Sequence, residues 1–314
     1  ERELVAADLD SDVHAASTQA SRQSHVNTWA RFHTRWFGLH TPVLPITVDK
    51  LRVVACQFKH AGYRSFTNYL GTMKDIHRES FGADSWSGDL ERWAHKATAS
   101  TQRGIGPPRQ CRELPITEVF ALGLGSEPLS ADGPICPNEW ATLCCFHLLR
   151  GSESACALSV SLSIDLAQKS ESFKLPVSKT DPQALGCRRT WGCVCSGFSN
   201  RPCPYCAAIK LKAEVATRFG PGLANSADFP LFPNRHGTWC SRNGFVSTLQ
   251  ALARRLGLDV ADELGRDVLG EHVWRISGAR HLASIDVPIS LIKLLARWQS
   301  EVVNRYVADA PLTA

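Results

Sequence analysis

Hydrophobic side chains recur at the spacing of α-helices between residues 24 and 97. Thr47 and Ser65 each precede an amphipathic segment, and both are residue types that cap helix N-termini. The pattern predicts a small helical bundle with three or more helices. The apolar positions that define it are Val26, Trp29, Ala30, Trp36, Phe37, Val48, Leu51, Ala55, Phe58, Phe66, Tyr69, Met73 and Ile76.

The segments that flank this bundle lack such periodicity. Residues 1–23 are polar without a sustained repeat, which predicts a loose tail. Residues 98–115 contain two glycines and two consecutive prolines, a composition typical of a linker between domains. Residues 116–314 then form a second domain, as expected for 314 residues at ~150 residues per domain.

The second domain combines helical and strand patterns. Residues 116–122, 139–149 and 245–256 have the periodicity of helices, whereas residues 159–166 and 173–177 alternate like short strands. The predicted fold is therefore mainly α with a small β-sheet (α+β), in which a helical bundle precedes a mixed α/β domain.

Composition narrows the class of protein only slightly. The net charge of +5 suits a nucleic-acid partner and many other proteins equally well. Twelve cysteines in a chain of this length, several beside apolar residues, indicate a reducing intracellular compartment, which would be the nucleus in a eukaryote. No apolar run reaches the ~20 residues of a membrane span. Because the chain begins with Glu1 and its only methionine is Met73, we expect it to be a fragment of a longer product.

Three short strings in the C-terminal half resemble the tyrosine recombinase (phage integrase) family. They are Leu-Arg-Gly-Ser-Glu at 149–153, His-Val-Trp-Arg at 272–275, and Ala-Arg-Trp-Gln-Ser at 296–300 followed by Tyr306. The similarity covers the chain beyond its N-terminal tail. The Arg-Trp-x-Ser wording and Ser-Lys-Thr-Asp at 178–181 are most similar to recombinases of eukaryotic DIRS-type and Crypton-type mobile elements.

This resemblance implies site-specific DNA recombination, by integration or excision, through a 3′-phosphotyrosyl intermediate. Tyr306 would be the nucleophile, and Lys179, predicted at a hairpin turn, would protonate the departing 5′ oxygen. Glu153 would orient Arg150, which the helical pattern places at the end of an apolar helix. Fixed cations replace a catalytic metal, so no cofactor is required. The implied catalytic residues are Arg150, Lys179, His272, Arg275, Trp298 and Tyr306, with Glu153 and Arg297 in support.

One position departs from the family pattern. The family usually places histidine or tryptophan nine residues before the nucleophile, whereas this chain has Arg297 there and Trp298 one residue later. Arg297 would donate to the phosphate, or Trp298 would pack against the helix of the nucleophile. The departure leaves open whether the enzyme is active.

A cluster of cysteines in residues 187–212 is interpreted as an insertion in the catalytic domain. Cys193-x-Cys195 and Cys203-x-x-Cys206 supply two close pairs of thiols, a pattern that can bind a structural zinc ion. The alternative is a set of reduced thiols without a metal. Neighbouring basic residues, Arg188 and Arg189 among them, would let the insertion face DNA.

Duplex DNA is the expected partner, bound by a homo-oligomer that is a dimer on one site and a tetramer in synapsis. Linker arginines Arg103, Arg109 and Arg112 are candidates for phosphate contacts, although they could equally be solvated charges. Two other functions remain open. One is a type IB topoisomerase that relaxes DNA by similar chemistry, and the other is an inactive mobile-element relic that only binds DNA.

Overall fold

The computed structural model describes residues 16–86, 88–106, 111–175, 186–195, 201–298 and 303–304. The chain divides into two compact units, Glu1–Pro108 and Arg109–Ala314. We refer to them as the N-terminal unit and, after the role that the sequence predicts for it, the catalytic unit. None of the described helices is both long and apolar enough to cross a membrane.

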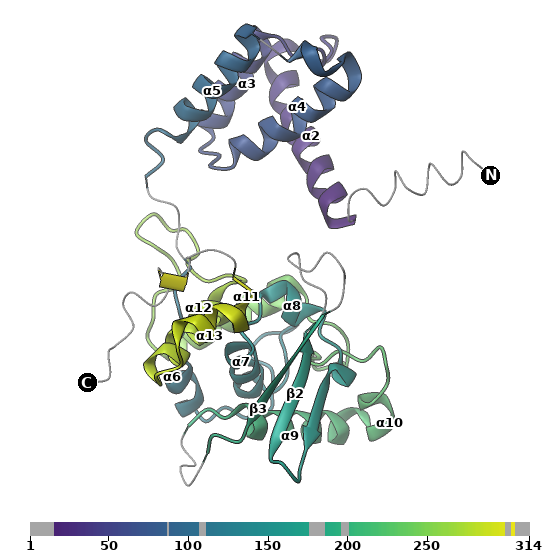
Figure 1. Ribbon diagram of the computed structural model, residues 1–314, viewed down its shortest axis with the longest axis vertical. Helices are drawn as coiled ribbons and strands as arrows, with labels where there is room; N and C mark the ends of the chain where they lie inside the picture. The colour runs from purple at the N-terminus through teal and green to yellow at the C-terminus, as the bar shows by residue number, and fades with distance from the viewer. Residues whose placement is uncertain are drawn as a thin grey trace, which may run out of the picture. The chain divides into compact units, whose positions relative to one another are not determined.

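The N-terminal unit is a helical bundle, as the hydrophobic pattern predicted (Figure 1). Trp29, Phe58 and Phe66 are fully buried at its centre, and their rings lie against one another. The Thr47 hydroxyl accepts a hydrogen bond from the Lys50 amide, which confirms Thr47 as a helix cap. The described helices are α2 (Ala16–Phe37), α3 (Val48–His60), α4 (Phe66–Phe81) and α5 (Gly88–Gln102), with a 3-10 turn, η1 (Ala83–Ser85).

Both ends of this bundle differ from the predicted boundaries. Helix α2 begins at Ala16, inside the segment predicted as a tail, and α5 continues to Gln102, inside the predicted linker. No glycine or proline interrupts the chain between Gly88 and Gly104, and Thr101 is buried, so the last turn of α5 is held by packing.

Helix α7 (Pro137–Phe146) forms the centre of the catalytic unit, where all of its residues are buried. It packs against α9 (Pro204–Phe219), α12 (Val273–Ser284) and α6 (Ile116–Ala121). The remaining described helices are α8 (Gly151–Ala155), α10 (Pro221–Ala224), α11 (Arg242–Arg255) and α13 (Ile289–Ala296), with a 3-10 turn, η2 (Ser159–Ser161).

A three-stranded antiparallel sheet flanks these helices among the described residues, in the order β1-β2-β3. It consists of β1 (Leu162–Asp165), β2 (Ser170–Leu175) and β3 (Cys187–Gly192), and α9 packs against all three strands (Figure 1). Phe173 and Leu175 of β2 are buried in the core. The alternation of β2 and its pairing with β1 confirm the predicted small sheet.

The structure also bears on three predictions for this unit, of which it corrects the end of one helix. The described residues of 187–212, the segment predicted as an insertion, form β3 and the start of α9. The turn between β1 and β2 lies at residues 166–169, and Lys179 lies in sequence between the antiparallel neighbours β2 and β3, outside the described residues. Its place at a hairpin turn stays a prediction. Helix α7 ends at Phe146, where Leu148 adopts a left-handed backbone with a φ of 51°. The buried Leu148 side chain offsets the cost of that conformation.

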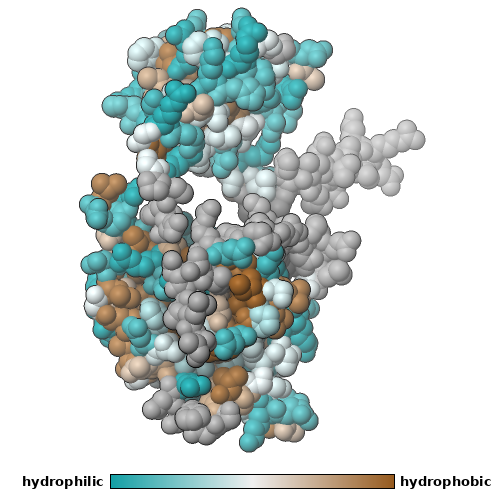
Figure 2. Space-filling view, turned by 60° about the vertical axis from the view of Figure 1, so that its left-hand side comes forward, coloured by the Kyte–Doolittle hydropathy of each residue, from teal (hydrophilic) through white to brown (hydrophobic). Residues whose placement is uncertain are grey.

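The two units differ in surface character. The visible face of the N-terminal unit is mostly hydrophilic, whereas that of the catalytic unit carries several hydrophobic patches (Figure 2). Large apolar side chains exposed on the catalytic unit include Ile289, Leu291 and Leu294 of α13.

Candidate active site

One buried carboxylate, that of Glu153 in α8, gathers three arginines from different parts of the catalytic unit. Its Oε1 lies 2.8 Å from Arg150 Nη1 and 2.9 Å from Arg297 Nη2, and its Oε2 lies 3.7 Å from Arg275 Nη1. The exposed fractions of the side chains are 6% for Glu153, 2% for Arg275, 13% for Arg297 and 24% for Arg150. We call these four residues the arginine cluster.

Arg150 is positioned by the turn that begins α8. It occupies the N-cap of that helix, and the Glu153 carboxylate accepts a hydrogen bond from the Arg150 amide at 2.9 Å as well as from its guanidinium. Arg150 therefore starts α8 and does not end α7, contrary to the sequence-based expectation. Glu153 holds both the backbone and the side chain of Arg150, as that expectation required.

Gly151 brings this turn against the loop that precedes α12. Its amide donates to the Glu271 carbonyl at 2.8 Å, and a Cβ on Gly151 would lie 2.8 Å from the Glu271 Cβ. A side chain at this position would push the two loops apart. Glycine thus allows Arg150 and His272 to come from adjacent backbone segments.

Helix α12 presents His272 and Arg275 from its first turn. His272 is the N-cap and Arg275 lies three residues later, which confirms that both sit at the start of one helix. The helix packs closely on α7, because a Cβ on Gly278 would lie only 2.1 Å from the Cys145 carbonyl oxygen. This close packing holds α12 in the interior of the unit. The Arg275 side chain, in the first turn of α12, is therefore buried.

The surroundings of the His272 side chain favour its neutral form. Partial burial, followed by the charges of Arg275 and Arg150, lowers its pKa from the ordinary value of 6.5. The imidazole therefore has a free ring nitrogen at neutral pH that can accept a proton.

The C-terminal end of α13 places both residues of the Arg297-Trp298 pair at the cluster. Arg297 is the C-cap in a left-handed conformation, with φ 57° and ψ 40°, and its side chain turns towards Glu153. The Trp298 ring lies against the Arg275 guanidinium, 5.3 Å from ring centroid to Cζ. Arg297 thus contacts the carboxylate of the cluster and Trp298 contacts Arg275. A phosphate contact of Arg297 and the packing of Trp298 on the helix of the nucleophile stay predictions.

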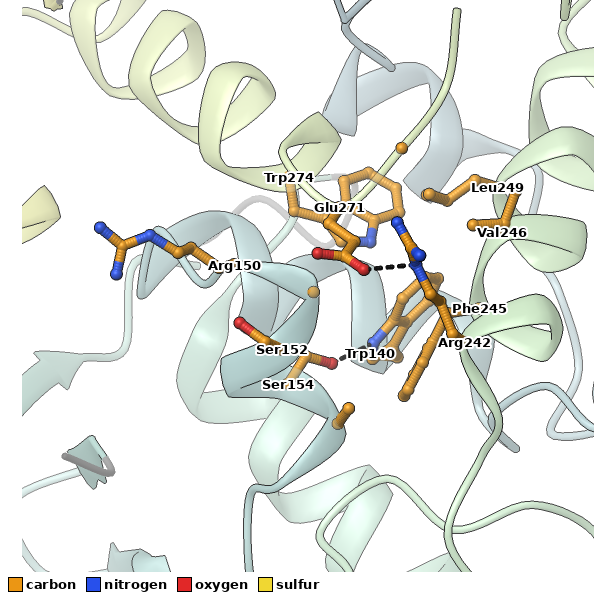
Figure 3. Close-up of a pocket in the computed structure, with 13 residues that line it drawn as sticks. Trp140, Arg150, Ser152, Ser154, Arg242, Phe245, Val246, Leu249, Glu271 and Trp274 are labelled. Atoms are coloured by element: carbon orange, nitrogen blue, oxygen red, sulfur yellow. Dashed lines mark hydrogen bonds and ion pairs between the residues drawn. The ribbon is translucent and has the colours of Figure 1, made fainter. Parts of the chain in front are cut away.

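A cavity of about 230 Å³ lies beside the cluster (Figure 3). Its walls include Trp140, Phe245 and Trp274, and an ion pair between Arg242 and Glu271 lies at 2.6 Å. The Arg150 side chain points away from these walls in Figure 3. Arg150 thus lines the edge of this mainly apolar cavity while its side chain points towards the arginine cluster.

Two predicted catalytic residues, Lys179 and Tyr306, lie outside the described residues. The described part of the chain closest in sequence to Tyr306 includes Val303, which is buried in the same hydrophobic cluster as Ala279 of α12 and Ile292 of α13. The assignments of Lys179 and Tyr306 stay predictions.

The candidate DNA-binding arginines have different surroundings. Arg103 is exposed near the end of α5, and Arg109 lies outside the described residues. Arg112 is exposed and pairs with Asp259 at 3.8 Å. Arg188 is exposed on β3, whereas Arg189 donates to the Leu294 carbonyl oxygen of α13 at 2.9 Å. Their contacts with DNA stay predictions, and Arg189 also has a contact within the protein.

The four cysteines named as metal ligands lie together, with their sulfur atoms all within 4.8 Å of one another. They join the end of β3 to the start of α9, away from the arginine cluster in sequence and on separate elements. Among the described residues they are the group of cysteine, histidine and acidic side chains best placed to hold a metal ion.

Known structures share this architecture. A dimer of lambda integrase bound to a COC′ core site has a TM-score of 0.63 with 13% identity, over 99% of this chain and 95% of that chain. The Tn1549 transposon integrase with transposon right end DNA has a TM-score of 0.59 with 11% identity, over 95% and 91%. The XerH site-specific recombinase bound to palindromic difH substrate in a post-cleavage complex gives 0.58 with 13% identity, over 91% and 76%.

No protein-family model and no curated protein matches the sequence. The structural comparisons nevertheless define the fold as that of DNA integrases and site-specific recombinases. More specifically, it is the tyrosine recombinase fold, with a mainly helical architecture and a small antiparallel sheet. This confirms the predicted fold class.

Proposed function

We propose that this protein is a tyrosine recombinase that breaks and rejoins duplex DNA at specific sites. The observation that carries the proposal is the arginine cluster, in which three guanidinium groups meet at one carboxylate. Three positive charges and one negative charge leave a net charge of +2. A phosphodiester, whose negative charge increases in the transition state, is the kind of group that this net charge stabilises.

Arg297 has an unused donor in this cluster. Its Nε is buried without an acceptor among the described residues. A buried donor without a partner is costly, and a phosphate oxygen would satisfy it. Arg150 is the most exposed of the three arginines and lies where a strand of DNA could approach from solvent.

The reaction follows from the residues assigned to the site. The Tyr306 hydroxyl attacks the scissile phosphorus while His272 accepts the phenolic proton. The bond from phosphorus to the 5′ oxygen breaks, and Lys179 donates a proton to that oxygen. A 3′-phosphotyrosyl bond replaces the phosphodiester. Attack by another 5′ hydroxyl reverses the step, so strands are exchanged without an external energy source or a catalytic metal.

The sheet offers further cationic surface for DNA. Lys174 of β2 and Arg188 of β3 are directly opposite in the register, and both are exposed. Like charges in such a pair repel, so the pair gains stability when an anion binds. The segment between these strands contains Lys179, and the two cations would lie on the backbone of the same DNA.

Assembly and location are part of the proposal. The lambda integrase relative is a DNA-bound dimer, which supports a dimer on each site, and strand exchange between two sites then requires a tetramer. Twelve cysteines in a chain of this length, several of them beside apolar residues, support an intracellular, reducing compartment, which would be the nucleus for a mobile element of DIRS or Crypton type.

A covalent trap tests the chemistry. Genomic fragments that bind the protein are recovered, nicked near the bound region so that the 5′ product diffuses away, and incubated with wild-type protein or Tyr306→Phe in the presence of a chelator. We expect an SDS-resistant protein–DNA adduct with the wild type and none with Tyr306→Phe. Tyr205→Phe, which alters another tyrosine of the catalytic unit, is the matched control and should form the adduct.

Two other outcomes would replace the proposal. DNA bound by both proteins without an adduct would indicate an inactive DNA-binding relic. An adduct accompanied by relaxation of supercoiled plasmid, with no recombinant product from paired sites, would indicate a topoisomerase. The integrase and recombinase folds of the relatives favour recombination over both.

A further inference from the structure

The sulfur atoms of Cys193, Cys195, Cys203 and Cys206 have the spacing of a tetrahedral metal site. Cys195 Sγ lies 3.4 Å from Cys206 Sγ, and Cys203 Sγ lies 3.9 Å from Cys193 Sγ. A zinc ion bound to four sulfurs at about 2.3 Å places them about 3.8 Å apart. The observed distances lie on either side of that value and are far longer than the ~2.05 Å of a disulfide.

The backbone around these cysteines also suits bound thiolates. Cys203 is buried at the N-cap of α9, and Cys206 follows in the first turn of that helix, where backbone amides and the helix dipole favour negative charge. The Val194 amide donates to Cys203 Sγ at 3.4 Å. The Cys193 amide donates to the Lys169 carbonyl at 2.8 Å, which fixes the first ligand to the turn between β1 and β2.

We propose that these four cysteines bind one structural zinc ion that fastens the end of β3 to the start of α9. Binding displaces the thiol protons, so that four thiols and Zn²⁺ give a tetrathiolate site and four protons. Four protein ligands leave no open position for water or substrate, and the ion has a structural role rather than a catalytic one.

The position of β3 explains why a zinc ion that links it to α9 would matter for the candidate active site. It is one of the two edge strands of the described sheet, and within that sheet its backbone pairs only with β2. Arg189 of β3 holds the Leu294 carbonyl of α13, three residues before Arg297. A fixed β3 therefore supports the end of α13 that delivers Arg297 and Trp298 to the arginine cluster.

Metal content is the first test, and it is independent of any activity on DNA. Protein purified under reducing conditions and reconstituted with Zn²⁺ is analysed by elemental mass spectrometry, and a sample with Co²⁺ is examined for the absorption bands of a tetrahedral tetrathiolate. We expect one metal ion per chain in the wild type, none in the Cys203→Ser/Cys206→Ser double variant, and one in Cys56→Ser. Cys56 is an exposed cysteine of α3 and serves as the matched control.

If the double variant fails to fold, the metal content of the wild-type protein alone tests the proposal. A wild type without stoichiometric metal after reconstitution, or one with iron as its only stoichiometric metal, would overturn the assignment of zinc. So would a disulfide between Cys195 and Cys206 under reducing conditions.

The structural role has its own measurement. Removal of the ion by a chelator should lower the Tm of the wild type by about 10 °C and leave the double variant unchanged. Hydrogen exchange should become faster in the amides of residues 187–192 while those of α2 keep their rates. Loss of the metal with no change in Tm or in exchange at β3 would show that the ion does not fasten the strand.

Discussion

Glu153 Oε1 lies 2.9 Å from Arg297 Nη2, across a separation of 144 residues in the sequence. The contact joins the turn after α7 to the end of α13. The same carboxylate that orients Arg150 therefore also compensates the charge of Arg297.

Glu153→Gln should damage both stability and cleavage. The amide keeps the shape of the side chain but removes the only carboxylate that the described structure pairs with all three arginines. Breaking a buried charge cluster in this way costs about 3 kcal/mol of unfolding free energy. Urea unfolding measures that loss, and the covalent trap should show a reduction of roughly 100-fold or more. Glu263→Gln, an exposed carboxylate elsewhere on the unit, should match the wild type.

The Arg297→Gly variant distinguishes the contribution of the Arg297 backbone conformation from that of its guanidinium group. Glycine adopts the left-handed C-cap conformation without the strain that arginine bears at φ 57°, which offsets part of the lost ion pair. We expect the unfolding free energy to change by less than about 1.5 kcal/mol and cleavage to fall roughly 100-fold. Arg255→Gly at the exposed end of α11 should retain cleavage. Full cleavage by Arg297→Gly would remove this residue from the active site.

The pH profile of cleavage tests His272 as the base. Its pKa is lowered, so the neutral, proton-accepting form persists below pH 6.5 and is lost as the pH falls through the lowered pKa. Cleavage rates should therefore be flat around neutrality and decline with an acidic limb centred below pH 6.5. His272→Gln should be slower and lose that limb, whereas His60→Gln, in the N-terminal unit, should retain it. A limb that persists in His272→Gln would assign the titration to another group.

Gly151→Ala tests the close approach of the two backbone segments that carry Arg150 and His272. The new methyl group would lie 2.8 Å from the Glu271 Cβ and 3.0 Å from its Cα, so the turn that carries Arg150 must move away from His272. We expect a loss of about 1–3 kcal/mol in unfolding free energy and a clear loss of cleavage with DNA binding retained. Gly125→Ala, where a Cβ would meet nothing within 4 Å, is the matched control. Equal behaviour of the two variants would contradict this account of Gly151.

The sequence by itself determined the local elements and much of the chemistry. Helical periodicity predicted α2 to α4, α6 and α11, and Thr47 marked a true cap, because these features depend on neighbouring residues along the chain. The short strings also identified Arg150, His272 and Arg275, which the structure brings together.

Tertiary structure decided what depends on residues that are distant in sequence. Strand β3 was missed because its alternation is weak and its partner β2 lies across a long connection, so only pairing reveals it. The role of Arg297 depended on where α13 ends relative to α8, and the convergence of the four cysteines depended on the packing of α9 against β3. A sequence records which groups are available, but the distances between them follow from the packing of the whole domain.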